Sequence, residues 1–139
     1  RNCYMTDNYL KGWLVKANTD IKVMDTLLRS SSEDLLTDVI CFHAQQAIEK
    51  FLKSYLISKE VVNKKTHNLE FLQDKCSEFL PQVKNFDFSI LSNYSIDVRY
   101  GEDFSLPSDK EALEAYDLAV KVKMFILEKL ELTEKDLIL

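Results

Sequence analysis

The chain of 139 residues contains only 2 Gly and 2 Pro, and this scarcity restricts its possible folds more than any other feature. Turn-rich β folds need both residue types, because Gly adopts positive φ and Pro presets the φ of a turn. Neither residue occurs between Gly12 and Pro81, nor between Pro107 and the C-terminus. Long helices require uninterrupted stretches of this kind, since Pro breaks a helix and Gly weakens it. The sequence therefore predicts an all-α fold.

Composition and length favour one folded domain. Hydrophobic residues make up 46% of the chain and charged residues 29%, which is typical of a globular rather than a disordered chain. The length suits a single domain over residues 1–139, with a core at about 7–130 and a tail at 131–139. No apolar run approaches the roughly 20 residues of a membrane span, and the N-terminus shows no apolar signal segment.

Cysteine spacing and net charge further restrict the kind of protein and the ligands it can bind. Cys3, Cys41 and Cys76 are far apart, so we expect reduced thiols in a cytoplasmic protein, with no metal site and no cofactor. The net charge of −5 argues against indiscriminate binding to nucleic acid, which depends on neutralising phosphates. Any contact with a nucleotide or RNA is therefore expected to be local.

Apolar residues recur every three or four positions over four segments, which predicts four amphipathic helices. The expected helices run from Thr6 or Asp7 to about Leu28, from about Glu33 to Ser58, from Thr66 or Asn68 to Pro81, and from Ser108 to about Leu130, with one short extra helix over Phe86–Tyr94. Candidate capping boxes are Ser30–Glu33 or Ser31–Asp34 for the second helix and Ser108–Glu111 for the last. Short connections between such helices predict an up-and-down four-helix bundle.

A strip of polar residues interrupts the apolar second helix at His43, Gln46 and Lys50. Residues three or four apart share a helix face, and a buried polar group costs about 1–3 kcal/mol unless it has a partner. The strip is therefore either a hydrogen-bonded network that fixes helix register or the floor of a binding site, where His43 can change charge near neutral pH. Glu49 and Lys53 are expected to form only a surface pair.

Two other segments carry candidate ligand-binding residues. His67 follows two lysines at the expected start of the third helix, where a helix N-terminus attracts anions; the alternative is a simple capping sequence. Arg99 and Tyr100 lie in the longest irregular segment, residues 95–107. Arg suits a phosphate or a carboxylate, and Tyr can stack on a base. The alternative for Arg99 is an ion pair with a carboxylate of its own segment.

Several motifs, in this order along the chain, resemble those of the HEPN family. Trp13, with Ala17 and Asp20 downstream, fits the first helix of that family. The other matching elements are Cys41–Lys53 (CFHAQQAIEKFLK), like the second-helix signature, Lys65–Leu69 (KTHNL), like a Lys-Thr-His-Asp-Leu element, and Val98–Tyr100, like an Arg-Tyr element. The resemblance covers roughly residues 8–130.

The resemblance implies a small all-α homodimer associated with nucleotides or RNA. Many relatives are toxins paired with a minimal nucleotidyltransferase, or parts of anti-phage defence systems. Several are metal-independent endoribonucleases whose catalytic motif is an Arg followed, after four to six residues, by a His. None of Arg1, Arg29 and Arg99 is followed by a His at that spacing, so the usual ribonuclease motif is absent.

Three functions remain open from the sequence. The first is a homodimeric nucleotide- or RNA-binding protein of a toxin–antitoxin or defence-type system. Its ligand-binding cleft would be lined by His43, Gln46, Lys50, His67, Arg99 and Tyr100. The second is a metal-independent endoribonuclease, with His43, His67 and Arg99 as candidate catalytic residues. The third is a non-catalytic interaction subunit of a nucleotidyltransferase, in which the polar strip is structural and the acidic second half of the chain contacts a basic partner.

Overall fold

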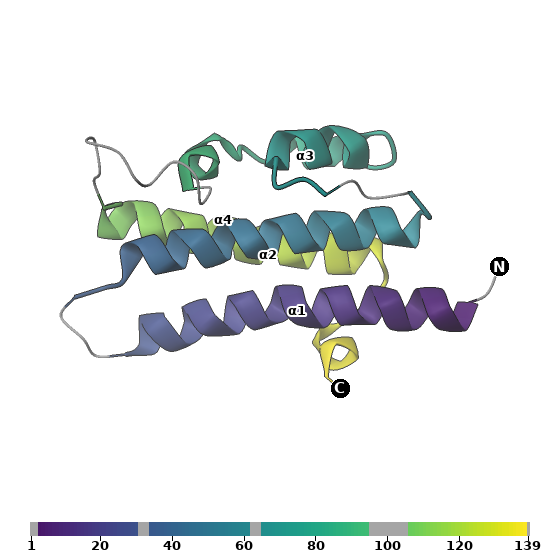
Figure 1. Cartoon of the computed structure of the whole chain (residues 1–139), viewed down its shortest axis with the longest axis horizontal. Coiled ribbons are helices and arrows are strands. Elements are labelled where there is room, and N and C mark those ends of the chain that lie inside the picture. The colour runs from purple at the N-terminus through teal and green to yellow at the C-terminus, as the bar shows by residue number, and fades with distance from the viewer. Residues whose placement is uncertain (1–2, 31–33, 62–64, 95–105, 139) are drawn as a thin grey trace.

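The long helices lie side by side, shorter helical segments follow one edge of them, and the last short helix lies on the opposite side, against the first helix (Figure 1). The computed structural model describes residues 3–30, 34–61, 65–94 and 106–138. In chain order its elements are α1 (Cys3–Arg29), α2 (Thr37–Ser58), α3 (Leu69–Ser77), the 3-10 helices η1 (Pro81–Asn85) and η2 (Ser89–Tyr94), α4 (Asp109–Lys129) and the 3-10 helix η4 (Glu134–Leu137). No strand occurs in the described ranges, and the predicted all-α bundle is confirmed.

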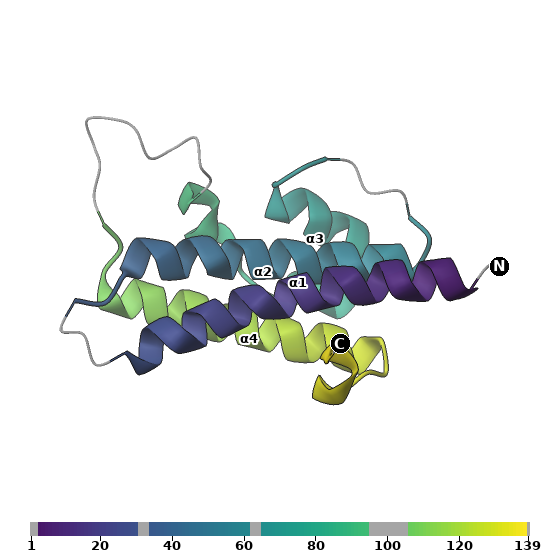
Figure 2. The same cartoon turned by 60° about the horizontal axis from the view of Figure 1, so that its bottom comes forward.

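The central element is α2, against which α1, α3, α4 and η2 all pack (Figures 1 and 2). Its sequence explains this position, because apolar residues surround most of the helix axis. The fully buried apolar residues of α2 include Ile40, Ala44, Ala47, Ile48, Phe51 and Leu52. With neighbours on most of its sides, α2 can hold a polar side chain only where a partner or the solvent is within reach.

Two of the predicted caps are present. Ser108 Oγ accepts a hydrogen bond from the backbone N–H of Glu111 at 3.0 Å, and Glu111 Oε1 accepts one from the N–H of Ser108 at 3.0 Å. At the start of α3, Asn68 Oδ1 accepts from the N–H of Phe71 at 3.0 Å. Each cap satisfies N–H groups that the first helical turn leaves without a partner, so these starts could be predicted locally.

The predicted start of the second helix is wrong. α2 begins at Thr37 rather than near Glu33, and the residue that precedes it, Leu36, makes no side-chain cap. Neither proposed capping box therefore starts this helix; residues 31–33 themselves lie outside the described residues. Leu35 packs against the core from a non-helical stretch, so burial of this side chain outweighs the local capping preference.

The third helix is short and its path matters for the site. α3 has 9 residues and runs along α2 in the same direction (Figures 1 and 2). His67, just before α3, contacts Glu49 in the middle of α2, and the ring of Phe79, just after it, lies 6.3 Å from the ring of Tyr55. The segment between α2 and α3 therefore doubles back, and η1 and η2 return the chain toward the start of α4.

The tail docks separately instead of extending α4. Glu131 has a φ of 58°, which ends the helix, and η4 then packs against α1. Leu137 is 3% exposed at this contact. The buried Lys123 of α4 donates to Asn18 Oδ1 at 2.8 Å and pairs with Glu134 Oε1 at 2.6 Å. Among the described helices, none combines the length and apolarity needed to cross a membrane.

Candidate functional site

Asp20 of α1 is a buried carboxylate that binds two basic side chains of α2. Its Oδ1 lies 2.7 Å from Nδ1 of His43, and its Oδ2 accepts from Nζ of Lys50 at 2.7 Å. The Asp20 side chain is 8% exposed, whereas those of His43 and Lys50 are 24% and 23% exposed. An unpaired carboxylate at this depth would be strongly unfavourable, so the two donors compensate for its burial.

A second buried carboxylate, Glu49, repeats the arrangement. Its Oε1 lies 2.8 Å from Nδ1 of His67, and its Oε2 accepts from Nζ of Lys53 at 3.1 Å. Glu49 and Lys53 are only 5% and 8% exposed, while His67 is 73% exposed. The expected surface pair of Glu49 and Lys53 is therefore wrong, because both side chains are buried, with Trp13 of α1 against Lys53 and His67 against Glu49.

The two imidazoles are oriented in the same way. An ionised carboxylate only accepts hydrogen bonds, so Nδ1 of His43 and of His67 carries the proton, and Nε2 lies on the opposite edge of each ring. A neutral Nε2 can take up a proton, and a protonated one donates to an anion. We call the six residues together the polar cluster: Asp20, His43, Glu49, Lys50, Lys53 and His67.

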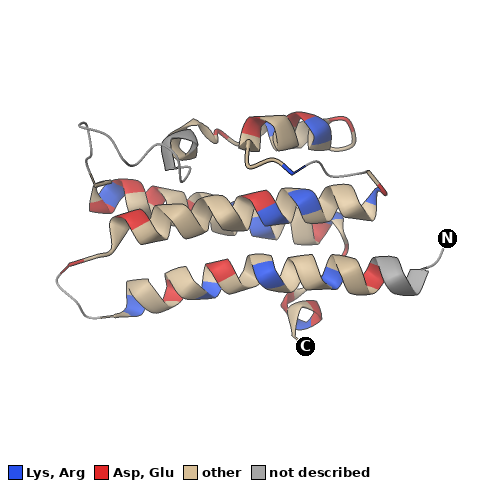
Figure 3. Ribbon diagram, in the orientation of Figure 1, with Lys and Arg blue, Asp and Glu red and all other residues tan. Residues whose placement is uncertain are grey.

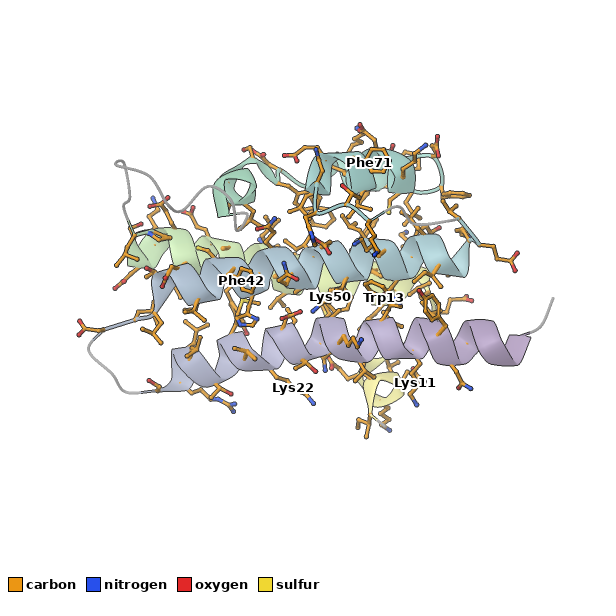
Figure 4. The ribbon with its side chains drawn as sticks, viewed as in Figure 1. Lys11, Trp13, Lys22, Phe42, Lys50 and Phe71 are labelled. Atoms are coloured by element: carbon orange, nitrogen blue, oxygen red, sulfur yellow. The ribbon has the colours of Figure 1, made fainter. Side chains whose placement is uncertain are left out.

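The polar cluster lies where α1 and α3 flank the middle of α2. Figure 3 shows acidic and basic colour side by side halfway along α2. In Figure 4, Lys50 lies at the boundary between α1 and α2, whereas Lys11 and Lys22 lie on the side of α1 away from α2. These two lysines of α1 therefore point away from the polar cluster.

Two aromatic residues of α1 adjoin the cluster. Nζ of Lys53 lies 5.6 Å from the ring centroid of Trp13. Tyr9, one helical turn earlier, lies edge-on to Trp13, with ring centroids 6.4 Å apart and an interplanar angle of 76°. Tyr9 is 59% exposed and Trp13 is half-buried. We call this pair the aromatic corner.

Three of the six predicted ligand-binding residues lie on the two buried carboxylates. His43 and Lys50 share Asp20, and His67 binds Glu49, the residue before Lys50. Gln46, half-buried, lies on the same helix. The other two predicted residues, Arg99 and Tyr100, lie outside the described residues.

Neither of the two buried carboxylates was among the ligand-binding residues that the sequence predicted. Asp20 had a usable signal, since it lies three residues after Ala17 and four before Met24, within the apolar stripe of α1. A carboxylate in such a stripe needs a buried partner. Glu49 gave a weaker signal, because its spacing to Lys53 is equally typical of an exposed pair.

Other ionisable groups lie apart from the cluster. Cys41 and Cys76 are buried, and burial raises the pKa of Cys76 to about 12. The hydrogen bond to Asp25 is the main cause that raises the pKa of Tyr116 to about 12. Within the described residues, no three His, Cys, Asp or Glu side chains are arranged to hold a metal ion.

The fold and the polar cluster define an all-helical bundle protein that carries histidines and lysines on two buried carboxylates. The family model of the HEPN domain matches residues 10–130, and the chain belongs to the HEPN domain family. Comparison with curated proteins and with solved structures gave no match. Membership in this family indicates a function related to nucleotides or RNA, and HEPN domains commonly dimerise.

Proposed function

We propose that this protein is a homodimeric nucleotide- or RNA-binding protein and that its polar cluster binds a phosphate of the ligand. The observation that carries the proposal is the Asp20 carboxylate, which holds His43 Nδ1 and Lys50 Nζ at 2.7 Å each. Both donors are already restrained by Asp20, so these two side chains lose less conformational freedom when a phosphate binds. A lysine ammonium is a common phosphate ligand, which suits Lys50 to this role. A protonated His43 adds a second donor.

The charge balance of the cluster supports an anionic ligand. Two lysines and two histidines face two carboxylates, so protonation of the imidazoles leaves an excess of positive charge. A bound phosphate favours that protonated form. The rest of the chain is acidic, with a net charge of −5, which opposes binding elsewhere on its surface.

Binding is proposed rather than catalysis because the usual Arg and His spacing of HEPN ribonucleases is absent from the sequence. We place the protein in a toxin–antitoxin or defence-type system of the cytoplasm, with a nucleotidyltransferase as a possible partner protein. The family supports this setting. Co-purification of the chain from its native host tests it, and recovery of the chain alone would contradict a stable partner.

The phosphate site is tested by a matched pair of lysine variants. Binding of nucleotides and of short single-stranded RNA is measured by calorimetry and fluorescence anisotropy for wild type, Lys50→Gln and Lys22→Gln. Loss of a charged hydrogen bond should weaken binding by about tenfold or more in Lys50→Gln. Lys22 is exposed and lies on the far side of α1, so its variant should bind as wild type does (Figure 4). Absence of binding by wild type, or equal losses in both variants, would refute the site.

The oligomeric state is tested separately. Light scattering at micromolar concentration should give the mass of a dimer. A monomeric mass would refute the homodimer without bearing on the phosphate site, whose described contacts all lie within one chain.

A second candidate, metal-independent RNA cleavage, is favoured by one observation: each imidazole has its Nδ1 on a buried carboxylate, as an oriented general base requires. In this hypothesis His43 or His67 takes the proton of the 2′-hydroxyl, and Arg99 stabilises the charged transition state. Cleavage should persist in EDTA and fall about 10²- to 10⁴-fold when the responsible His is replaced by Gln. RNA left intact by wild-type protein would rule this candidate out.

A further inference from the structure

The aromatic corner presents two large rings at nearly a right angle beside the polar cluster. Tyr9 and Trp13 are separated by one helical turn, and their planes meet at 76°. Tyr9 is 59% exposed, so most of this ring contributes little to the core. A flat aromatic molecule can stack on one ring of such a corner and meet the edge of the other, which are the two favourable geometries between aromatic groups.

Side-chain contacts connect the aromatic corner to the polar cluster. Lys53 lies 5.6 Å from the Trp13 centroid and 3.1 Å from Glu49, and the other oxygen of Glu49 binds His67. On α1, Trp13 and Asp20 are seven residues apart on one face, a separation of about 10 Å along the helix. In Figure 4, Lys50 and Trp13 both lie along the boundary between α1 and α2.

Aromatic faces beside basic side chains are the combination that binds single-stranded nucleic acid. The lysines attract the backbone, and each exposed ring accepts an unpaired base by stacking. A duplex keeps its bases paired and stacked on one another, so it cannot offer one to a protein ring without paying for unstacking. The surface therefore matches a ligand that carries both a phosphate and an unpaired base.

We propose that the aromatic corner is a nucleobase subsite, where an unpaired base stacks on Tyr9 against Trp13 while an adjoining phosphate binds Lys50 and its neighbours. This inference rests on the proposed function and extends it, since it names the part of the ligand that the cluster alone does not recognise. Stacking needs only a π-face, so the subsite tolerates different bases. The ligand class is single-stranded RNA or a free nucleotide rather than a duplex.

The chain carries its own reporter for this contact, because Trp13 is its only tryptophan. Short single-stranded RNA is titrated into the protein beside an abasic sugar–phosphate oligomer of equal length, a duplex of the same sequence and a mononucleotide. Tryptophan fluorescence reports stacking, and anisotropy of labelled oligomers reports binding. The base-bearing strand and the nucleotide should quench Trp13, while the abasic oligomer should bind more weakly and leave the fluorescence unchanged.

Two variants complete the test. Tyr9→Ala should weaken binding of the base-bearing strand by about fivefold to 100-fold, the range of one base–aromatic stack, and leave the abasic affinity unchanged. Met124→Ala removes a side chain of similar exposure, 55%, from α4 and should change neither affinity. Circular dichroism of both variants confirms that they are folded.

The outcomes separate this inference from the proposed function. Equal binding of base-bearing and abasic strands, no effect of Tyr9→Ala, or a duplex bound as tightly as the single strand overturns the nucleobase subsite alone, provided that Lys50→Gln still weakens binding. Absence of binding by every oligomer overturns the phosphate site and the subsite together. Quenching that Tyr9→Ala abolishes, with abasic binding retained, supports the subsite.

Discussion

The Nδ1 atom of His43 and the Oδ1 atom of Asp20 are 2.7 Å apart, across residues 23 positions apart in the sequence. The contact ties the middle of α2 to α1, and Lys50 completes it at the second carboxylate oxygen. The same atoms therefore satisfy a buried carboxylate and hold two basic groups at the surface. We therefore expect stability and the proposed ligand binding to be coupled at this point of the bundle.

Asp20→Asn is expected to impair both properties. Asn has one acceptor oxygen in place of two and no charge, so either His43 or Lys50 loses its partner. The free energy of unfolding should fall by about 1–3 kcal/mol, since the two partners retain some exposure to water. Urea denaturation followed by circular dichroism measures this. Asp7→Asn on the exposed start of α1 is the control, and equal stability of the two variants would contradict the prediction.

Glu49→Gln and His67→Ala should differ sharply in stability although both change the same contact. Glu49→Gln removes the negative charge beside the ammonium of Lys53, which is 8% exposed, and should cost about 3 kcal/mol or more. His67 is 73% exposed, so His67→Ala should stay within about 0.5 kcal/mol of wild type. Thermal unfolding compares them. A loss in His67→Ala as large as that in Glu49→Gln would show that the imidazole, not the lysine, dominates the buried pair.

The docked tail should stabilise the folded protein mainly through one side chain, that of Leu137. Leu137 is 3% exposed against the bundle, and its neighbour Ile138 is 68% exposed. Leu137→Ala should lower the free energy of unfolding by about 2–3 kcal/mol, and Ile138→Ala should leave it nearly unchanged. Equal stability of the two variants in urea would mean that the tail is not packed against the bundle in solution.

The buried thiol of Cys76 should react only after unfolding. In a variant that keeps Cys76 alone, made by Cys3→Ser and Cys41→Ser, a thiol reagent at about pH 8 should be excluded until urea is added, because the thiolate is the reacting form. Rapid reaction of the folded variant would contradict the burial of this side chain.

The raised pKa of the Cys76 thiol predicts that the free energy of unfolding falls at alkaline pH. Burial raises the pKa of Cys76 from 9.0 to about 12, so the folded state favours the protonated thiol. The stabilisation that the folded state draws from the protonated Cys76 thiol is complete below pH 9 and is lost as the pH rises toward 12. Tyr116, whose pKa is also about 12, titrates in the same range, so the comparison uses a Tyr116→Phe background. In the Tyr116→Phe background, Cys76→Ala should make the free energy of unfolding depend less on pH in this alkaline range. An unchanged dependence would contradict the prediction.

Local rules explain which parts of the fold could be predicted. The Ser108 and Asn68 caps are satisfied by groups three residues away, so the starts of α4 and α3 follow from sequence alone. The start of α2 could not be predicted, since the burial of Leu35 depends on the packed core rather than on its neighbours in sequence. The polar strip was predicted correctly to need partners or solvent, yet its partner Asp20 lies on another helix.

By itself, the sequence determined the helical class, most helix ends and the presence of polar residues on an apolar helix, because these follow from glycine and proline content, periodicity and capping within a few residues. Only the tertiary structure decided that Asp20 and Glu49 are the buried acceptors, that Lys53 is covered rather than exposed, and that Tyr9 and Trp13 adjoin them. These relationships join residues on different helices. Their geometry depends on how α1, α2 and the doubled-back segment before α3 pack together, which no local pattern encodes.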